Sequence, residues 1–390
     1  MKKTPEFNKR GVFFAFFLLL MFPAAAFAHK LPAGFKGFRS SASCRPCHLQ
    51  IYNEWSMSMH SMSGRSSDPA HDAVFRAFSQ SMAKAGKKAP YFCGSCHNPA
   101  AGRPASGRLA SGAKEAYSSN PGIPCAFCHS VEGMSGGKLF NTYALSTSMT
   151  SAGAVSGVSA PHPVSKWSFN SPSQMCLGCH GKMKNGRGTV ICSMDMEGHS
   201  DCVKCHMPKT PGAPAAYPAM KKTDIFVKDT HFSHLFPGGH YTNMLKAGIS
   251  LSLEVNNGML SVNIKNANPH YFPSTSPMRA AYVKVEFLDK NGKVLFASPA
   301  PMPGKKELFM RVFTAGPKKG VPPWMAEKAV DSRIKSGETR TLTYAVPKGS
   351  ARARAVLYYR LFTPAAAAKF GIPARMAKPV KVTETGINID

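Results

Sequence analysis

The sequence predicts two unlike parts: a domain of mostly irregular chain and short helices over residues 29–245, and an antiparallel β-sandwich over residues 246–390. Two distributions indicate this division. All 11 cysteines and every histidine but one of 14 precede residue 245. After it, apolar and polar residues alternate in short runs separated by Asn-Gly, Pro and Gly turns, a pattern typical of antiparallel strands.

The first 28 residues have the three parts of a secretory signal peptide. The basic region contains Lys2, Lys3, Lys9 and Arg10. The apolar run is GVFFAFFLLLMF, and the cleavage site is Ala26-Phe27-Ala28. The apolar run is shorter than the ~20 residues that a membrane helix needs. We therefore expect cleavage, a mature chain from His29 with no stable membrane span, and a periplasmic, secreted or cell-surface location in a bacterium; an uncleaved anchor is the alternative.

One pattern, Cys-x-x-Cys-His, occurs five times between residues 44 and 206. The copies are CRPCH (Cys44, Cys47, His48), CGSCH (Cys93, Cys96, His97), CAFCH (Cys125, Cys128, His129), CLGCH (Cys176, Cys179, His180) and CVKCH (Cys202, Cys205, His206). This pattern attaches c-type haem: the two thiols bond to the porphyrin edge, and the adjacent histidine ligates the iron. We therefore expect five covalently attached haem c groups in residues 29–245, which makes this part a multihaem domain.

Zinc binding and disulfide formation are the two other common uses of cysteine. Zinc sites also combine Cys and His at short spacing, and exported proteins normally form disulfides. Neither explains a histidine directly after every pair or an odd total of 11 cysteines. The eleventh, Cys192, is expected to be a buried, unreactive thiol. The close spacing of the motifs also predicts closely packed haems, which would form much of the core of a segment rich in Gly, Pro and Ser.

Five irons need five further ligands if each is bound by two histidines, the ligation typical of low-potential, low-spin haems for electron transfer. Nine histidines lie outside the motifs. The candidates for distal ligands are His60, His162, His199, His231, His234, His240 and His270. His71, after Asp68-Pro69, is expected only to begin a helix, and the N-terminal His29 is given no ligand role.

The candidates occur in different settings. His60 lies in EWSMSMHSM, which is predicted to be helical, and two of the three histidines in THFSHLFPGGH are expected to be ligands. His270 is the one histidine of the second part, on the loop NANPHYFPS. Because Pro269 and Pro273 restrict this loop, we expect it to hold His270 as the sixth ligand of a haem at the domain interface. A loop histidine bonded to the backbone is the alternative.

Several runs after residue 248 predict strands. Two hairpins, ISLSLEV–NNG–MLSVNIKN and AYVKVEFLDKNGKVLFAS, turn at Asn-Gly, and further strands are expected in ETRTLTYAVP, ARAVLYYRLF and PVKVTETG. About seven strands at this spacing predict an antiparallel sandwich. Such a domain needs no haem to fold, so we expect it to dock on the haem-bearing part or protect it.

The chain is strongly basic, with a formal net charge of +29. Haem propionates would offset the charge of the first part, so the basic excess belongs mainly to the second. An acidic redox partner and a merely solvated face both fit this excess. Nucleic acid is not expected, because no nucleic-acid-binding motif accompanies the charge.

The stretches CRPCH, YNEWSMSMH and CVKCHMP resemble multihaem cytochromes c related to the tetrahaem cytochrome of ammonia oxidisers, a superfamily with pentahaem nitrite reductase and octahaem hydroxylamine oxidoreductase. The stretches HFSHLFPGGH, VNIKNANPHYFPSTSPMR, DSRIKSGETRTLTYAVP and AVLYYR resemble a β-domain that some members carry after their haems. The resemblance covers residues 40–365. In that pattern the histidine matching His270 usually follows glycine, whereas Pro269 precedes it here.

The resemblance implies an electron carrier or a reductase of small nitrogen or sulfur compounds. No Cys-x-x-Cys-Lys site, the mark of the open haem in nitrite reductase, is found. With nine spare histidines every iron can be six-coordinate, so we expect electron transfer between redox partner proteins rather than catalysis. The alternatives are a reductase of a nitrogen or sulfur oxyanion with one open haem, and a haem-bearing surface or filament subunit.

Overall fold

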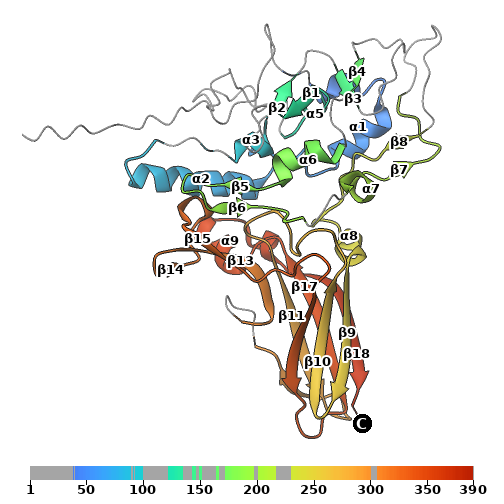
Figure 1. Cartoon of the computed structure of the whole chain (residues 1–390), viewed down its shortest axis with the longest axis vertical. Helices are drawn as coiled ribbons and strands as arrows, with labels where there is room; N and C mark the ends of the chain where they lie inside the picture. The colour runs from blue at the N-terminus through green and yellow to red at the C-terminus, as the bar shows by residue number, and fades with distance from the viewer. Residues whose placement is uncertain are drawn as a thin grey trace, which may run out of the picture.

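The computed structural model describes residues 38, 40–88, 91, 93–99, 122–134, 143–145, 149–151, 164–166, 172–196, 201–216, 230–299 and 305–389. Two parts lie end to end (Figure 1). The elements that carry the Cys-x-x-Cys-His motifs form one end, and long antiparallel strands form the other. No helix of the described residues has both the length and the apolar character needed to cross a bilayer.

The first part consists of short helices and very short strands. Its helices are η2 (Ser41–Cys44), α1 (Leu49–Ser56), α2 (Pro69–Lys84), α3 (Gly94–His97), α5 (Cys125–Cys128), α6 (Pro172–His180), α7 (Cys202–His206) and α8 (Thr242–Ala247). Its strands are β1 (Val131–Met134), β2 (Tyr143–Leu145), β3 (Met149–Ser151), β4 (Val164–Lys166), β5 (Met183–Lys184), β6 (Val190–Cys192), β7 (Lys209–Thr210) and β8 (His231–Phe232). The one long helix, α2, begins where the sequence predicts a start, with Asp68 as its N-cap and Pro69 in its first turn.

The second part is β-rich, as the sequence predicts. Its strands are β9 (Ile249–Asn256), β10 (Met259–Asn266), β11 (Ala280–Leu288), β12 (Val294–Ala297), β13 (Leu308–Ala315), β14 (Lys318–Lys319), β15 (Lys328–Asp331), β16 (Thr339–Ala345), β17 (Arg352–Arg360) and β18 (Val380–Asn388). The short helices η3 (Pro323–Met325), α9 (Pro364–Phe370) and η4 (Ala374–Ala377) connect them. The strands form a three-stranded sheet, β16-β10-β9, and a seven-stranded sheet with the central order β14-β13-β11-β17-β18.

Both predicted hairpins are present. Strands β9 and β10 pair from Ile249↔Asn266 to Asn256↔Met259, across a turn in which Asn257 and Gly258 both have positive φ. This is the conformation that Asn-Gly favours between antiparallel strands. One apolar core contains Leu260, Val262 and Ile264 of the small sheet together with Val283, Val285, Phe287 and Leu357 of the large one. The two sheets therefore pack on each other through their apolar faces.

The two parts are joined by apolar and polar contacts. Ala70 and Ala73 of α2 pack with Ala367 of α9, with Ile372 just after α9, and with Met278 just before β11. In a second cluster Ile191 of β6 packs with Phe313 of β13 and Ala326. The buried Asn185 donates hydrogen bonds to the carbonyls of Pro323 (2.9 Å) and Ala326 (2.8 Å). These contacts fix the β-rich part against α2 and against the segment between the fourth and fifth motifs.

Candidate functional site

The motif cysteines lie on or next to short helical turns, and different motifs are neighbours in space. Side-chain hydrogen bonds join Cys44 to Cys125 and Cys176 to Cys202. Burial raises the pKa of the Cys128 thiol, and the charge of the nearby Cys179 raises it further. The first motif thus adjoins the third, the third adjoins the fourth, and the fourth adjoins the fifth. The chain therefore places these attachment sites in one contiguous group.

The orientation of the motif histidines fits iron ligation. Nδ1 of His48 lies 2.7 Å from the carbonyl oxygen of Ala215, and Nδ1 of His206 lies 2.6 Å from that of Pro237. A metal-bound histidine usually donates its second ring nitrogen to such an oxygen, which fixes the ring and leaves Nε2 for the metal. These two imidazoles are therefore held in the orientation that a haem iron requires.

Three motif histidines contact the ring of a histidine outside the motifs. The ring centroids of His60 and His180 are 6.2 Å apart, and those of His129 and His234 are 6.3 Å apart. The rings of His71 and His97 are closer, at 4.5 Å. A metal ion bound by two imidazoles on opposite sides holds their centroids roughly 6 Å apart, since each metal–nitrogen bond is about 2 Å. The first two pairs have the spacing of a two-histidine iron site.

The pair of His71 and His97 lacks this spacing, and a role for His71 as a ligand rests on its burial instead. His71 is 6% exposed, and its Nδ1 lies 2.8 Å from the carbonyl oxygen of Ser63. Among the described residues, none forms a hydrogen bond with its buried Nε2. A buried polar atom without a partner costs free energy, and a metal bond would remove that cost. His71 therefore has the local environment of a ligand opposite His97.

Burial keeps these imidazoles neutral. It lowers the pKa of His60 to about 4, of His71 to about 2, and of His180 and His234 to about 3. In each case a neighbouring histidine adds to the decrease. Only neutral imidazole has a lone pair for iron, so the surroundings favour the protonation state that ligation needs.

The backbone at His60 is held by the segment before the third motif. The Ile123 N–H donates to the His60 carbonyl (2.8 Å), and the Trp55 indole donates to the Ile123 carbonyl (2.9 Å). A Cβ on Gly122 would lie 2.3 Å from the His60 oxygen, so only glycine permits this approach. The predicted helix around His60 is shorter than expected, because α1 ends at Ser56 and His60 lies in the turn that follows.

The remaining candidate ligands are not all found next to a motif histidine. His231 has both ring nitrogens engaged, Nδ1 with the Ala213 carbonyl (2.9 Å) and Nε2 with Glu54 (3.1 Å), so it does not present a nitrogen to iron here. His162 and His199 lie outside the described residues.

His270 lies at the junction of the two parts. It forms an isolated bridge with Met196, and its Nδ1 is 3.1 Å from the Tyr271 carbonyl. Burial lowers the His270 pKa, and the His206 charge contributes to the decrease, so the fifth motif is close by.

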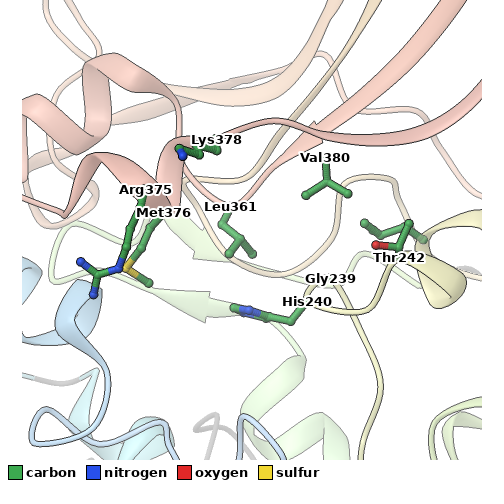
Figure 2. Close-up of a pocket in the computed structure, with 9 residues that line it drawn as sticks. Gly239, His240, Thr242, Leu361, Arg375, Met376, Lys378 and Val380 are labelled. Atoms are coloured by element: carbon green, nitrogen blue, oxygen red, sulfur yellow. The ribbon is translucent and has the colours of Figure 1, made fainter.

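His240 lines a cavity of about 180 Å³ between the two parts. The cavity is bounded by Gly239, His240, Thr242, Leu245, Leu361, Arg375, Met376, Lys378 and Val380. Figure 2 shows the side chains of His240 and Leu361 next to each other, with Arg375 and Met376 to one side and Thr242 and Val380 to the other. His240 therefore borders a cavity that residues of the β-rich part also line.

Cys192 is partly buried in β6. Burial raises its pKa to about 12, and the nearby Cys93 of the second motif adds to the increase. The thiolate is disfavoured, as expected for an unreactive thiol.

The chain has similarity to known cytochromes. A model of the family described as cytochrome c554 and c-prime matches residues 43–130. A comparison with curated proteins finds no match. Among solved structures, a penta-heme cytochrome c552 from Thermochromatium tepidum matches with a TM-score of 0.70 and 26% identity, over 90% of this chain and 99% of that one. The two matches and the repeated Cys-x-x-Cys-His motif support the assignment of the chain as a multihaem c-type cytochrome with covalently bound haem.

Proposed function

We propose that the protein is an exported pentahaem c-type cytochrome that transfers electrons between redox partners. The observation that carries this proposal is the neighbouring arrangement of four of the five motifs, each of which ends in a histidine. When bound, c-type haem supplies a one-electron couple between ferric and ferrous iron. The similarity to a penta-heme cytochrome over nearly the whole chain supports the count of five.

We assign the distal ligands from the histidine contacts. His60 belongs with His180 and His234 with His129, on the ring distances of 6.2 and 6.3 Å. His71 is assigned to His97, the motif histidine that its ring contacts, because its buried Nε2 has no hydrogen-bond partner among the described residues. His270 is assigned to the fifth motif, because the His206 charge reaches it. His162, His199 and His240 remain the candidates for the haem of His48. Two-histidine ligation leaves the iron no open position, so the relay function is favoured over the reductase.

The remaining assignments follow from the same function. Residues 1–28 are the signal peptide, 29–245 the haem domain, and 246–390 a β-sandwich docked on it. Export brings the chain to the periplasm or the cell surface. The redox partners carry acidic surfaces, complementary to the basic excess of the second part.

The test is the coordination state of the holoprotein. The pyridine haemochrome assay and the mass of the mature protein are expected to give five haems per chain. Electron paramagnetic resonance of the oxidised protein is expected to show low-spin iron only, and cyanide should leave the spectrum unchanged. A high-spin fraction that binds cyanide or nitrite would contradict the relay, and bound zinc in place of haem would contradict the assignment as a whole.

Replacement of Gly122 by alanine is expected to disturb the haem of the fourth motif. The added Cβ would lie 2.3 Å from the His60 oxygen and 2.5 Å from that of Ser61, so the His60 backbone must move. We expect a high-spin component in the oxidised spectrum of the loaded protein. Gly186→Ala is the control, because a Cβ at Gly186 meets nothing within 4 Å; equal spectra for both variants would show that Gly122 does not position His60.

A further inference from the structure

Phe236 packs against two histidines that are assigned to different irons. The centroid of its ring lies 4.3 Å from that of His60 and 5.6 Å from that of His234. His60 is assigned to the haem of the fourth motif and His234 to that of the third, from their contacts with the motif histidines. One half-buried side chain therefore contacts a ligand of each of two haem sites.

The backbone of Phe236 has a conformation that is unusual for a bulky residue. Its φ is 49°, in the left-handed region that glycine and asparagine adopt most readily. Pro237 follows, and proline favours a negative φ and an extended conformation in the residue before it. Such a conformation costs free energy and persists where surrounding contacts determine it. The turn alone does not require a ring here, so we attribute the strain to the contacts of the ring with the two histidines.

The chain just before Phe236 is fixed by Glu54 of α1. One oxygen of the Glu54 carboxylate accepts a hydrogen bond from the His234 N–H (2.8 Å), and the other lies 3.1 Å from Nε2 of His231. The side chain of Glu54 is 17% exposed and that of His231 only 1%. Hydrogen bonds to a carboxylate are stronger than those between neutral groups, so this one side chain holds the chain at residues 231–234.

The chain just after Phe236 is fixed by the fifth motif. Nδ1 of His206 lies 2.6 Å from the carbonyl oxygen of Pro237, the next residue. Both neighbours of the Phe236 turn are therefore hydrogen-bonded to distant parts of the chain. The ring of Phe236 is held in place from both sides.

We propose that Phe236 is a positioning residue for the irons of the third and fourth motifs, because its ring fixes the orientation of the His60 and His234 imidazoles. Side chains that contact a metal ligand orient it and thereby tune the metal. The rings of His60 and His180 make an angle of 53°, and those of His129 and His234 an angle of 18°. The angle between two axial imidazoles determines how the iron d orbitals split, so the two haems should have distinct low-spin signals. This inference rests on the proposed function, since it requires haem at these motifs with these ligands.

The experiment records electron paramagnetic resonance spectra of the oxidised holoprotein with Phe236→Gly and with Phe236→Tyr. Glycine removes the ring and adopts a positive φ freely, so the backbone conformation can be kept. In Phe236→Gly we expect two low-spin signals of the unaltered protein to be lost and replaced by shifted, broader ones, while the other signals stay. Tyrosine keeps the ring, so Phe236→Tyr should give the spectrum of the unaltered protein.

Two ligand variants assign the signals. The low-spin signal lost in His60→Ala belongs to the haem of the fourth motif, and the signal lost in His234→Ala belongs to that of the third. Phe236→Gly should change both of these signals in one protein. A change in neither signal, or in only one of them, would overturn the proposal.

The control variant is Phe296→Ala. Phe296 of β12 is also half-buried, and its ring packs on the rings of Phe287 (5.9 Å) and Tyr344 (6.3 Å). No described ring contact of Phe296 involves a histidine. Phe296→Ala should lower the thermal stability and leave every signal unchanged. If Phe236→Gly also lowers only the thermal stability, its ring serves packing alone and the proposal is wrong.

Failure of the proposed function gives a different result. Absence of haem from the unaltered protein, measured by pyridine haemochrome, would overturn that function and this inference with it. Iron that stays entirely low-spin in both His60→Ala and His234→Ala would overturn the ligand assignment. A fully loaded, low-spin protein whose spectrum Phe236→Gly leaves intact would overturn only the role of Phe236.

Discussion

Replacement of His234 by alanine is expected to convert one haem of the holoprotein from low-spin to high-spin iron. The His234 ring lies 6.3 Å from that of His129, with an angle of 18° between the rings, and burial lowers its pKa to about 3. A neutral, half-buried imidazole at this spacing from a motif histidine is the arrangement of a distal ligand. Its loss leaves one iron with an open position, which electron paramagnetic resonance and cyanide binding detect.

The control for this experiment lies three residues away. His231 is 5% exposed, but its Nε2 contacts Glu54 at 3.1 Å instead of a motif histidine. His231→Gln keeps a hydrogen-bonding side chain there and is expected to leave all iron low-spin. A high-spin signal from His231→Gln, with none from His234→Ala, would reverse the assignment of the two residues. The experiment thus separates two histidines that the sequence pattern THFSHLFPGGH does not distinguish.

The covalent chemistry of the site could be predicted from sequence because it is local. Cys-x-x-Cys-His contains both attachment atoms and the proximal ligand within five residues, so no tertiary information is needed. The distal ligands come from distant segments, and their identity depends on which loops meet. The histidine-rich turn THFSHLFPGGH makes His231 one of three candidates, but Glu54, 177 residues away in the chain, engages its ring.

His71 shows the opposite case. Asp68-Pro69 correctly predicts the start of α2, and that reading gave the histidine no further role. The signal that sequence analysis missed is its position in the first turn of a helix whose apolar face includes Ala70 and Ala73. A histidine on that turn, beside the buried alanines, is itself buried, at 6% exposure. Its contact with His97 arises only when the second motif packs against the same turn.

The β-rich part was more readily predicted, since alternation and Asn-Gly turns are also local signals. Strands β9 to β12 and β16 to β18 match the predicted runs. Strands β13, β14 and β15 were not predicted. β15, KAVD, has four residues and is exposed along its whole length, so no apolar alternation marks it. Pairing with β13 defines β15, and pairing is a tertiary property.

Replacement of Asp195 by alanine is expected to destabilise the junction of the two parts by about 3 kcal/mol or more. Asp195 lies between the fourth and fifth motifs, and its carboxylate accepts hydrogen bonds from Arg311 (2.7 Å) and Arg333. Asp331 shares the same two guanidinium groups, which are 8% and 5% exposed. Without Asp195 one carboxylate must balance two buried cations. Urea unfolding followed by circular dichroism measures the loss, and limited proteolysis near residue 195 reports separation of the parts.

The comparison variant is Glu327→Gln, because the Arg187–Glu327 pair also joins the two parts, at 2.5 Å, but its side chains are 51% and 45% exposed. Exposed pairs contribute roughly 0–1 kcal/mol, so this variant should change the free energy of unfolding little. Similar losses in both variants would show that burial does not determine the strength of these pairs.

The contribution of Asp195 should also depend on pH in a defined direction. Burial disfavours the charged form of Asp195, but hydrogen bonds from Arg333 and Ser193 outweigh it, and the pKa of Asp195 is lowered. The pKa of Asp331 is lowered in the same way, against burial and chiefly by Arg333. A lowered pKa stabilises the folded state fully above the unfolded carboxyl pKa of about 3.9, and this stabilisation is lost as the pH falls further. The difference between the unaltered protein and Asp195→Ala should therefore be constant from pH 5 to pH 8 and decrease below about pH 4. A difference that stays the same at pH 3 would mean that Asp195 contributes through packing rather than through its charge.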